Sequence, residues 1–165
     1  MTRKEHLEFN PLALVLACVL PGLGHAARGE VRRGLCIAAG ILGLFFGGML
    51  IGGIDVVDRV EDKWWFLLQA GVGPTAFAAD AVHQKMLKVP GPSGRPQTPL
   101  PGAAAGSGAP RITKSLGRVN EVGSLYTALA GMLNMIAIID AGWFFPRPRP
   151  SRRAEAAAPP GARTA

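Results

Sequence analysis

The chain has 165 residues, 48% of them hydrophobic, and a formal net charge of +7 from 18 Lys and Arg against 11 Asp and Glu. This length suits one small bundle of elements rather than two globular domains. The basic residues lie between and after apolar segments, and no aromatic residues alternate with them, which argues against a nucleic-acid-binding protein and favours the basic loops of a membrane protein.

The first apolar segment covers residues 11–27 and is interrupted by one proline and two glycines. Membrane helices tolerate such interruptions, so the segment is expected to span the bilayer, to be re-entrant or to lie at the membrane interface. A second interpretation is a lipidated periplasmic protein, because two basic residues precede the segment and residues 15–18 (VLAC) faintly resemble a lipoprotein cleavage site.

The second segment, residues 34–57, is the most informative part of the chain. Its stretch 35–54 (LCIAAGILGLFFGGMLIGGI) contains no charge, no amide and no hydroxyl group. At about 1.5 Å rise per residue, a helix of this length spans about 30 Å, the thickness of the bilayer hydrocarbon. The segment therefore predicts a transmembrane helix.

The third segment, residues 64–82, has Gly71, Gly73 and Pro74 near its middle, so it too is expected to span, to be re-entrant or to be interfacial. The fourth lies within residues 111–145, where a short lead-in precedes an apolar stretch. Tryptophans begin the third segment and lie near the end of the fourth, as expected for helix ends at the membrane surface.

Residues 90–110 and 146–165 are dense in Pro, Gly and Ala and too poor in bulky apolar groups to form a core, so both are predicted to be disordered. The predicted fold is all-α. It is an integral membrane bundle of three or four transmembrane helices, three of them in residues 1–89 and the fourth in residues 111–145.

The turn between the first two segments, residues 21–34 (PGLGHAARGEVRRG), is expected to form a tight helical hairpin. His25 is interpreted as a packing or capping residue, with a proton carrier as the alternative. Basic side chains at this place reach lipid phosphates or the membrane surface. The motif consists of Pro21, Gly22, Gly24, His25, Gly29, Arg33 and Gly34.

The PGLGH sequence with its following glycine and RRG distantly resembles the hairpin of TM2-domain-like small bacterial membrane proteins, but Ala26 and Ala27 stand where that pattern has aromatic residues. Together with residues 123–141 (GSLYTALAGMLNMIAIIDA), it is more similar to an uncharacterised bacterial family of multi-pass membrane proteins, a domain of unknown function. This resemblance implies a membrane location and no established activity. The expected location is the bacterial cytoplasmic (inner) membrane.

Small residues recur at helical spacing in the second and fourth segments. In lipid, such residues let helix backbones approach closely, and an amide on the same face can hydrogen-bond across the contact. We expect the two segments to pack through these faces, within one chain or between copies. The candidate packing residues are Gly43, Gly47, Gly48, Gly52, Gly123, Thr127, Gly131 and Asn134.

Two acidic residues, Asp80 and Asp140, lie within the third and fourth segments, close to their ends. A carboxylate near hydrocarbon is costly unless it is paired or solvated, so each is a candidate for a relay of protons or ions or for a partner contact. Because both lie near segment ends, a structural role at the membrane surface is the favoured interpretation.

The expected function is that of a non-catalytic integral membrane protein, acting as a scaffold, an assembly factor or a small subunit of a membrane complex. No enzyme signature is present in the sequence. The alternatives are a small transporter or channel-forming oligomer, and the lipidated periplasmic protein. Expected partners are membrane lipids, including anionic ones, and other membrane proteins or further copies of the chain. Neither nucleic acid nor a cofactor is expected. No metal site is expected either, because Cys18 and Cys36 form no CxxC pair and the chain has only three histidines.

Overall fold

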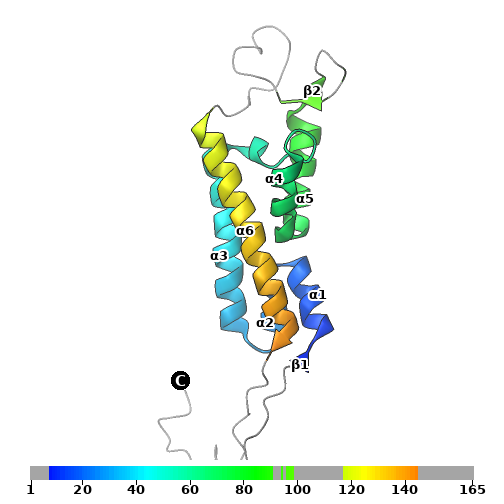
Figure 1. Cartoon of the computed structure of the whole chain (residues 1–165), viewed down its shortest axis with the longest axis vertical. Coiled ribbons are helices and arrows are strands. Elements are labelled where there is room, and N and C mark those ends of the chain that lie inside the picture. Colours follow the sequence, from blue (N-terminus) through cyan, green and yellow to red (C-terminus); the bar gives the residue numbers. More distant parts are fainter. Residues whose placement is uncertain (1–7, 91–93, 95, 99–116, 145–165) are drawn as a thin grey trace, which may run out of the picture.

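The computed structural model describes residues 8–90, 94, 96–98 and 117–144, and these are mostly helical. Two long helices, α3 (Val31–Gly52) and α6 (Arg118–Gly142), run along the whole length of the bundle in opposite directions (Figure 1). The other helices are much shorter and pack against this pair at one end or the other.

The amino-terminal helices form a hairpin at the end where α3 begins. Helix α1 (Pro11–Val19) starts after Asn10, whose side chain caps it by accepting a hydrogen bond from the backbone N–H of Ala13 at 3.0 Å. It ends just before Pro21, which has no N–H to continue the helix. Helix α2 (Leu23–Ala27) then returns along α1, against which it packs.

A second hairpin enters from the opposite end. After α3, the short 3-10 helix η1 (Ile54–Val56) leads to α4 (Lys63–Gln69), and the chain reverses through η2 (Ala70–Val72) into α5 (Pro74–Val82). The rings of Phe66 and Phe77, one from each arm, lie 5.3 Å apart. A π-helical turn, η3 (His83–Leu87), follows α5.

Two small antiparallel ladders close the ends of the bundle. Strand β1 (Glu8–Phe9) pairs with β4 (Trp143–Phe144), which ties the amino-terminal hairpin to the end of α6. Strand β2 (Val89–Pro90) pairs with β3 (Pro96–Gln97) at the other end.

The tips of the two hairpins meet part-way along the bundle. The backbone at Gly73 lies so close to the carbonyl oxygen of Cys18 that a side chain there would collide with it. In Figure 1, α1 lies below α5 on the same side of the α3–α6 pair. The main apolar core lies between α3 and the second hairpin and includes Ile41, Phe45, Val56, Val57, Val72 and Ala76.

Among the described residues, only α3 and α6 are long and apolar enough to cross a membrane. The expectation of three or four spanning helices is not confirmed. The predicted segments 11–27 and 64–82 each bend back on themselves, at Pro21 and Gly22 in the first and at η2 and Gly73 in the second. Both glycines have positive φ angles, +79° and +88°, which favour glycine and reverse the chain direction.

The boundaries of the long helices also differ from those expected. Helix α3 begins three residues before the predicted segment 34–57 and stops at Gly52, where Gly53 has a φ of +88°. Helix α6 occupies the apolar part of the predicted segment 111–145, whose first six residues lie outside the described part of the chain. The predicted tail 146–165 and most of 90–110 also lie outside it.

Candidate functional site

The outward surfaces of α3 and α6 are apolar and exposed. In the most hydrophobic 18-residue window of α3, only 22% of the residues are buried within the chain, whereas the core helix of a soluble protein would be mostly buried. Exposed large apolar side chains on the two helices include Leu35, Phe46, Leu50, Leu129, Leu133 and Ile136. So many exposed large apolar side chains on two helices are typical of contact with a membrane or a protein partner.

Helices α3 and α6 contact one another through residues without bulky side chains. A methyl carbon added to Gly48 would lie 2.8 Å from the carbonyl oxygen of Gly123, and one added to Gly123 would lie 2.7 Å from the Cα of Gly52. Thr127, fully buried, lies against Gly48 in the same contact. Four of the candidate packing residues are therefore brought together where two backbones touch.

The other two glycines predicted on α3 lie elsewhere. A Cβ added to Gly43 or Gly47 would meet no atom of the described chain within 4 Å, so both open outward. The four glycines form two pairs with a spacing of four residues, Gly43 with Gly47 and Gly48 with Gly52. The first pair lies on a different face of the helix from the second. Only the second pair contributes to packing within the chain.

The remaining small and polar residues of α6 contact the tip of the second hairpin. A methyl carbon on Gly71 would lie 2.6 Å from the carbonyl oxygen of Gly131. The amide of Asn134 donates to the Gly71 carbonyl at 2.9 Å, and the amide of Gln69 donates to the Thr127 hydroxyl at 2.9 Å. The polar side chains of α6 therefore contact the second hairpin inside the bundle. Sequence reasoning missed Gln69, although a single amide in an apolar segment was a usable signal.

The predicted hairpin motif meets the end of α6 in a cluster of charges. His25 is fully buried, and its Nε2 lies 2.7 Å from a carboxylate oxygen of Asp140, a side chain that is 44% exposed. Because an ionised carboxylate only accepts, Nε2 is the donor. Arg33 donates to the same oxygen at 2.7 Å, and Arg28 donates to the backbone carbonyl of Asp140 at 2.9 Å. Asp140 is therefore paired from three sides.

The glycines of this motif account for its compactness. The backbone at Gly22 touches that of Gly34 on α3, and Gly24 fits against Ala13 on α1, with no space for a side chain at either position. Gly29 has a φ of +87° and open surroundings, so its role is the turn before α3. Pro21 ends α1, as described above.

A second charged cluster lies at the opposite end of the bundle. Asp80 accepts from the backbone N–H of Arg59 at 3.0 Å and lies 3.1 Å from the Arg59 guanidinium. Beside it, the buried ammonium of Lys88 lies 2.6 Å from the buried carboxylate of Asp58 and 3.3 Å from that of Glu61. Sequence reasoning did not single out Asp58 or Lys88, because they are thirty residues apart and become a pair only when the hairpin closes.

Burial alone would raise the pKa of the Asp58 carboxyl. The neighbouring Lys88 ammonium and the backbone N–H groups of Val60 and Glu61, which donate at 2.8 and 3.2 Å, outweigh that effect. They hold the pKa of Asp58 below its ordinary value of 3.8. This carboxylate stays ionised at neutral pH. Its ion pair with Lys88 connects the loop after α3 to the end of the second hairpin.

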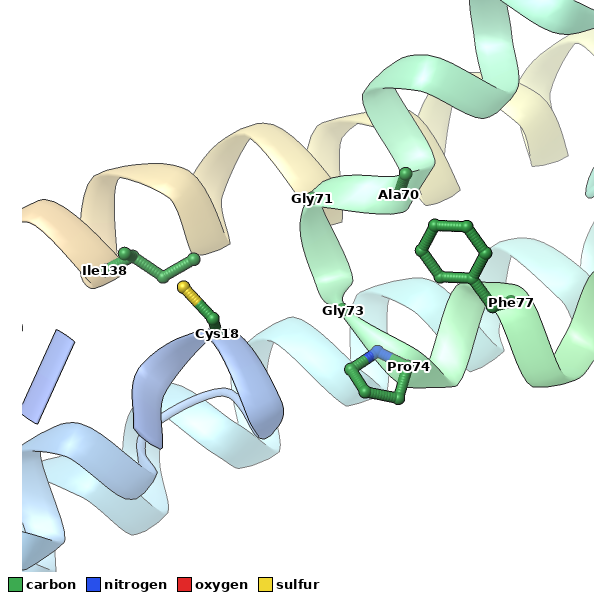
Figure 2. Close-up of a pocket in the computed structure, with 7 residues that line it drawn as sticks. All are labelled: Cys18, Ala70, Gly71, Gly73, Pro74, Phe77 and Ile138. Atoms are coloured by element: carbon green, nitrogen blue, oxygen red, sulfur yellow. The ribbon is translucent and has the colours of Figure 1, made fainter. Parts of the chain in front are cut away.

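An apolar cavity of about 510 Å³ lies where the two hairpin tips meet (Figure 2). It is lined from α1, from the second hairpin and from α6, and Figure 2 shows the Cys18 thiol pointing toward Ile138. Cys18 and Cys36 are free thiols. The lining offers no acid, base or metal ligand other than this thiol, and its residues are Cys18, Ala70, Gly71, Gly73, Pro74, Phe77 and Ile138.

Comparisons with curated proteins and with solved structures give no match. A protein-family model does match, over residues 12–154, and this range includes both hairpins, both long helices and the two charged clusters. The chain therefore belongs to the family of unknown function DUF6677.

Proposed function

We propose that this chain is a non-catalytic integral membrane protein that serves as a scaffold, an assembly factor or a small subunit of a membrane complex. The observation that carries the proposal is the exposed apolar surface of α3 and α6, together with the inward position of the polar side chains of α6. In this arrangement lipid or another apolar surface covers the outside, and the internal polar groups hold the bundle together.

The dimensions of the bundle agree with this placement. The 22 residues of α3 correspond to about 33 Å, slightly more than the hydrocarbon thickness of about 30 Å. The His25–Asp140 cluster lies at one end of the bundle and the Asp58–Lys88 cluster at the other, where the two head-group regions would be. The two hairpins would then each enter half of the bilayer, with their tips meeting between its two surfaces.

A non-catalytic role is supported by how the polar side chains are used. Asp140, Asp80 and Asp58 each bind basic or backbone groups of the chain itself. Gln69 and Asn134 hold the second hairpin against α6. We further propose that residues 90–110 and 146–165 contact the partner, and that the membrane is the bacterial inner membrane.

Site-specific photo-crosslinking in native membranes tests the scaffold role. A photoreactive residue at Leu50, which is 87% exposed, or at Leu129 should give a discrete adduct with another membrane protein or with a second copy of the chain. The same residue at the fully buried Phe45 is the matched control and should react only within the chain. Adducts with lipid alone from every outward position would overturn the proposal.

One observation favours a second candidate, a small transporter. Half-length segments that meet near the middle of the bilayer are a recurring feature of transporters. Beside this meeting point, the buried carbonyl oxygen of the Asn134 side chain accepts no hydrogen bond from any described group. Solute flux into liposomes containing the purified chain, abolished by Asn134→Leu, would favour this candidate. Intact-mass measurement of the amino terminus tests the lipidated alternative.

A further inference from the structure

A groove of about 560 Å³ runs along the outer surface between α3 and α6. It begins at Arg33 and Asp140, at the end of the bundle where α3 starts, and reaches Leu44 on α3 and Leu133 on α6. From Arg33 to Leu44, at 1.5 Å per residue, the groove extends about 16 Å along the helix, which is about half the thickness of the bilayer hydrocarbon. Its length therefore corresponds to one leaflet.

The groove is polar at one end and apolar over the rest of its length. Beyond Arg33 and Asp140, its lining is aliphatic or small and includes Ile37, Gly40 and Leu44. A ligand that fits this pattern has a polar group at the membrane surface and a hydrocarbon chain directed toward the middle of the membrane.

The polar end favours an anion. The Arg33 side chain is 46% exposed and donates once to Glu30, at 3.2 Å, and once to Asp140, at 2.7 Å. A guanidinium has five N–H donors, so donors remain for a phosphate. Arg32 and Arg33 also line the adjoining depression at the start of α3. This end of the bundle therefore has three arginines, including Arg28, and two carboxylates, those of Glu30 and Asp140.

Gly40 keeps the groove open. A Cβ at this position would meet no atom of the described chain within 4 Å. Of the three glycines of α3 with open surroundings, Gly40, Gly43 and Gly47, only Gly40 lines the groove. The missing side chain at this position leaves space for an acyl chain.

We propose that this groove binds an anionic phospholipid, one acyl chain lying along Gly40 between α3 and α6 and the phosphate facing Arg33 and Arg32. The proposal rests on the membrane placement given above. Basic pockets between transmembrane helices are known binding places for anionic head groups. A second copy of the chain is less suitable as the occupant, because a symmetric contact in one membrane would bring two arginine clusters together at the same depth.

Native mass spectrometry of the full chain in a neutral detergent tests the proposal. The probes are palmitoyl-oleoyl phosphatidylglycerol and phosphatidylcholine at equal concentration. The wild-type chain should retain phosphatidylglycerol about fivefold more than phosphatidylcholine, the factor expected for one basic residue near the membrane surface. Arg33→Gln should bring the ratio close to one, whereas Lys63→Gln, an exposed residue at the opposite end, should leave it unchanged.

A second variant tests the acyl part of the site. Gly40→Leu should fill the groove and lower the retention of both lipids, whereas Gly47→Leu, equally open but outside the groove, should not. Thermal stability should not fall in either variant, because both positions are open and leucine favours helix more than glycine does, and this separates loss of the groove from loss of the fold. Equal retention of the two lipids by the wild type, or no effect of Gly40→Leu, would overturn the inference. If the chain stays in carbonate-washed membranes but does not prefer phosphatidylglycerol, the lipid site is refuted and the proposed membrane placement is not.

Discussion

The buried imidazole of His25 lies 2.7 Å from the carboxylate of Asp140, 115 residues later in the chain, and joins the amino-terminal hairpin to the last turn of α6. The contact gives both residues a structural role. It connects the buried histidine of the hairpin motif with Asp140, one of the two acids singled out as candidates near segment ends.

Asp140→Ala should therefore destabilise the chain. Removing a charged acceptor from a buried donor typically costs about 1–3 kcal/mol, and His25 would lose its partner. Asp140→Asn should cost less, because the amide oxygen still accepts from His25. Denaturant unfolding in detergent micelles measures both. Equal stability of Asp140→Ala and the wild type would contradict this role.

Gly123→Ala should destabilise the packing of α3 against α6. The added methyl group would lie 2.7 Å from Gly52, and overpacking of this kind typically costs about 1–3 kcal/mol. Gly43→Ala is the matched control, because the space around Gly43 is open and alanine favours helix. Thermal unfolding of the two variants should differ clearly. A Gly43 variant that is the less stable of the two would refute the contact.

Lys88→Met should unfold or strongly weaken the second hairpin. Removal of one partner of a buried ion pair typically costs about 3–5 kcal/mol, because the remaining charge, here Asp58, stays buried without compensation. Asp58→Leu in the Lys88→Met background should restore part of the lost stability. A double variant less stable than Lys88→Met would count against a mutual pair.

The lowered pKa of Asp58 predicts a dependence of stability on pH. A carboxyl whose pKa is lower in the folded than in the unfolded chain stabilises the fold above the unfolded value of 3.8, and this contribution disappears as pH falls through the lower folded pKa. The stability difference between the wild type and Asp58→Asn should therefore shrink between about pH 5 and pH 2. A difference that stays constant or grows over that range would show that Asp58 is not stabilised as its anion.

The long helices were predictable from local sequence alone. An uninterrupted apolar run predicts α3 well, and the glycine at position 53 explains why the helix stops before residue 57. Helical periodicity also identified which small residues share a face. It did not indicate which face meets the neighbouring helix, so Gly43 and Gly47 could not be distinguished from Gly48 and Gly52.

The hairpins and the charged clusters were less predictable, because they depend on contacts between distant parts of the chain. Apolar composition is the same in a spanning helix and in two half-length arms, so residues 64–82 alone left both possibilities open. The reversed chain after Gly73 makes a contact with Cys18 and brings Lys88 to Asp58. Neither contact has a signal in local sequence.

The arrangement of two long helices and two opposed hairpins predicts which positions are reached from each side of a membrane. A cysteine at Val31, where α3 begins, and one at Val60, in the loop after α3 ends, are both at exposed positions and should react with a membrane-impermeant maleimide added to opposite sides. Native Cys18, at the hairpin tip, should react from neither side. Single-cysteine variants in intact and inverted vesicles measure this, and reaction of Val31→Cys and Val60→Cys from one side only would exclude the arrangement.

The most direct test of the account is whether the full chain stays in membranes after an alkaline carbonate wash and flotation on a density gradient. Because α3 and α6 expose apolar side chains along their whole length, the chain should remain with the floating vesicles and leave them only when detergent is added. Release into the aqueous fraction as a single monodisperse species would contradict the account.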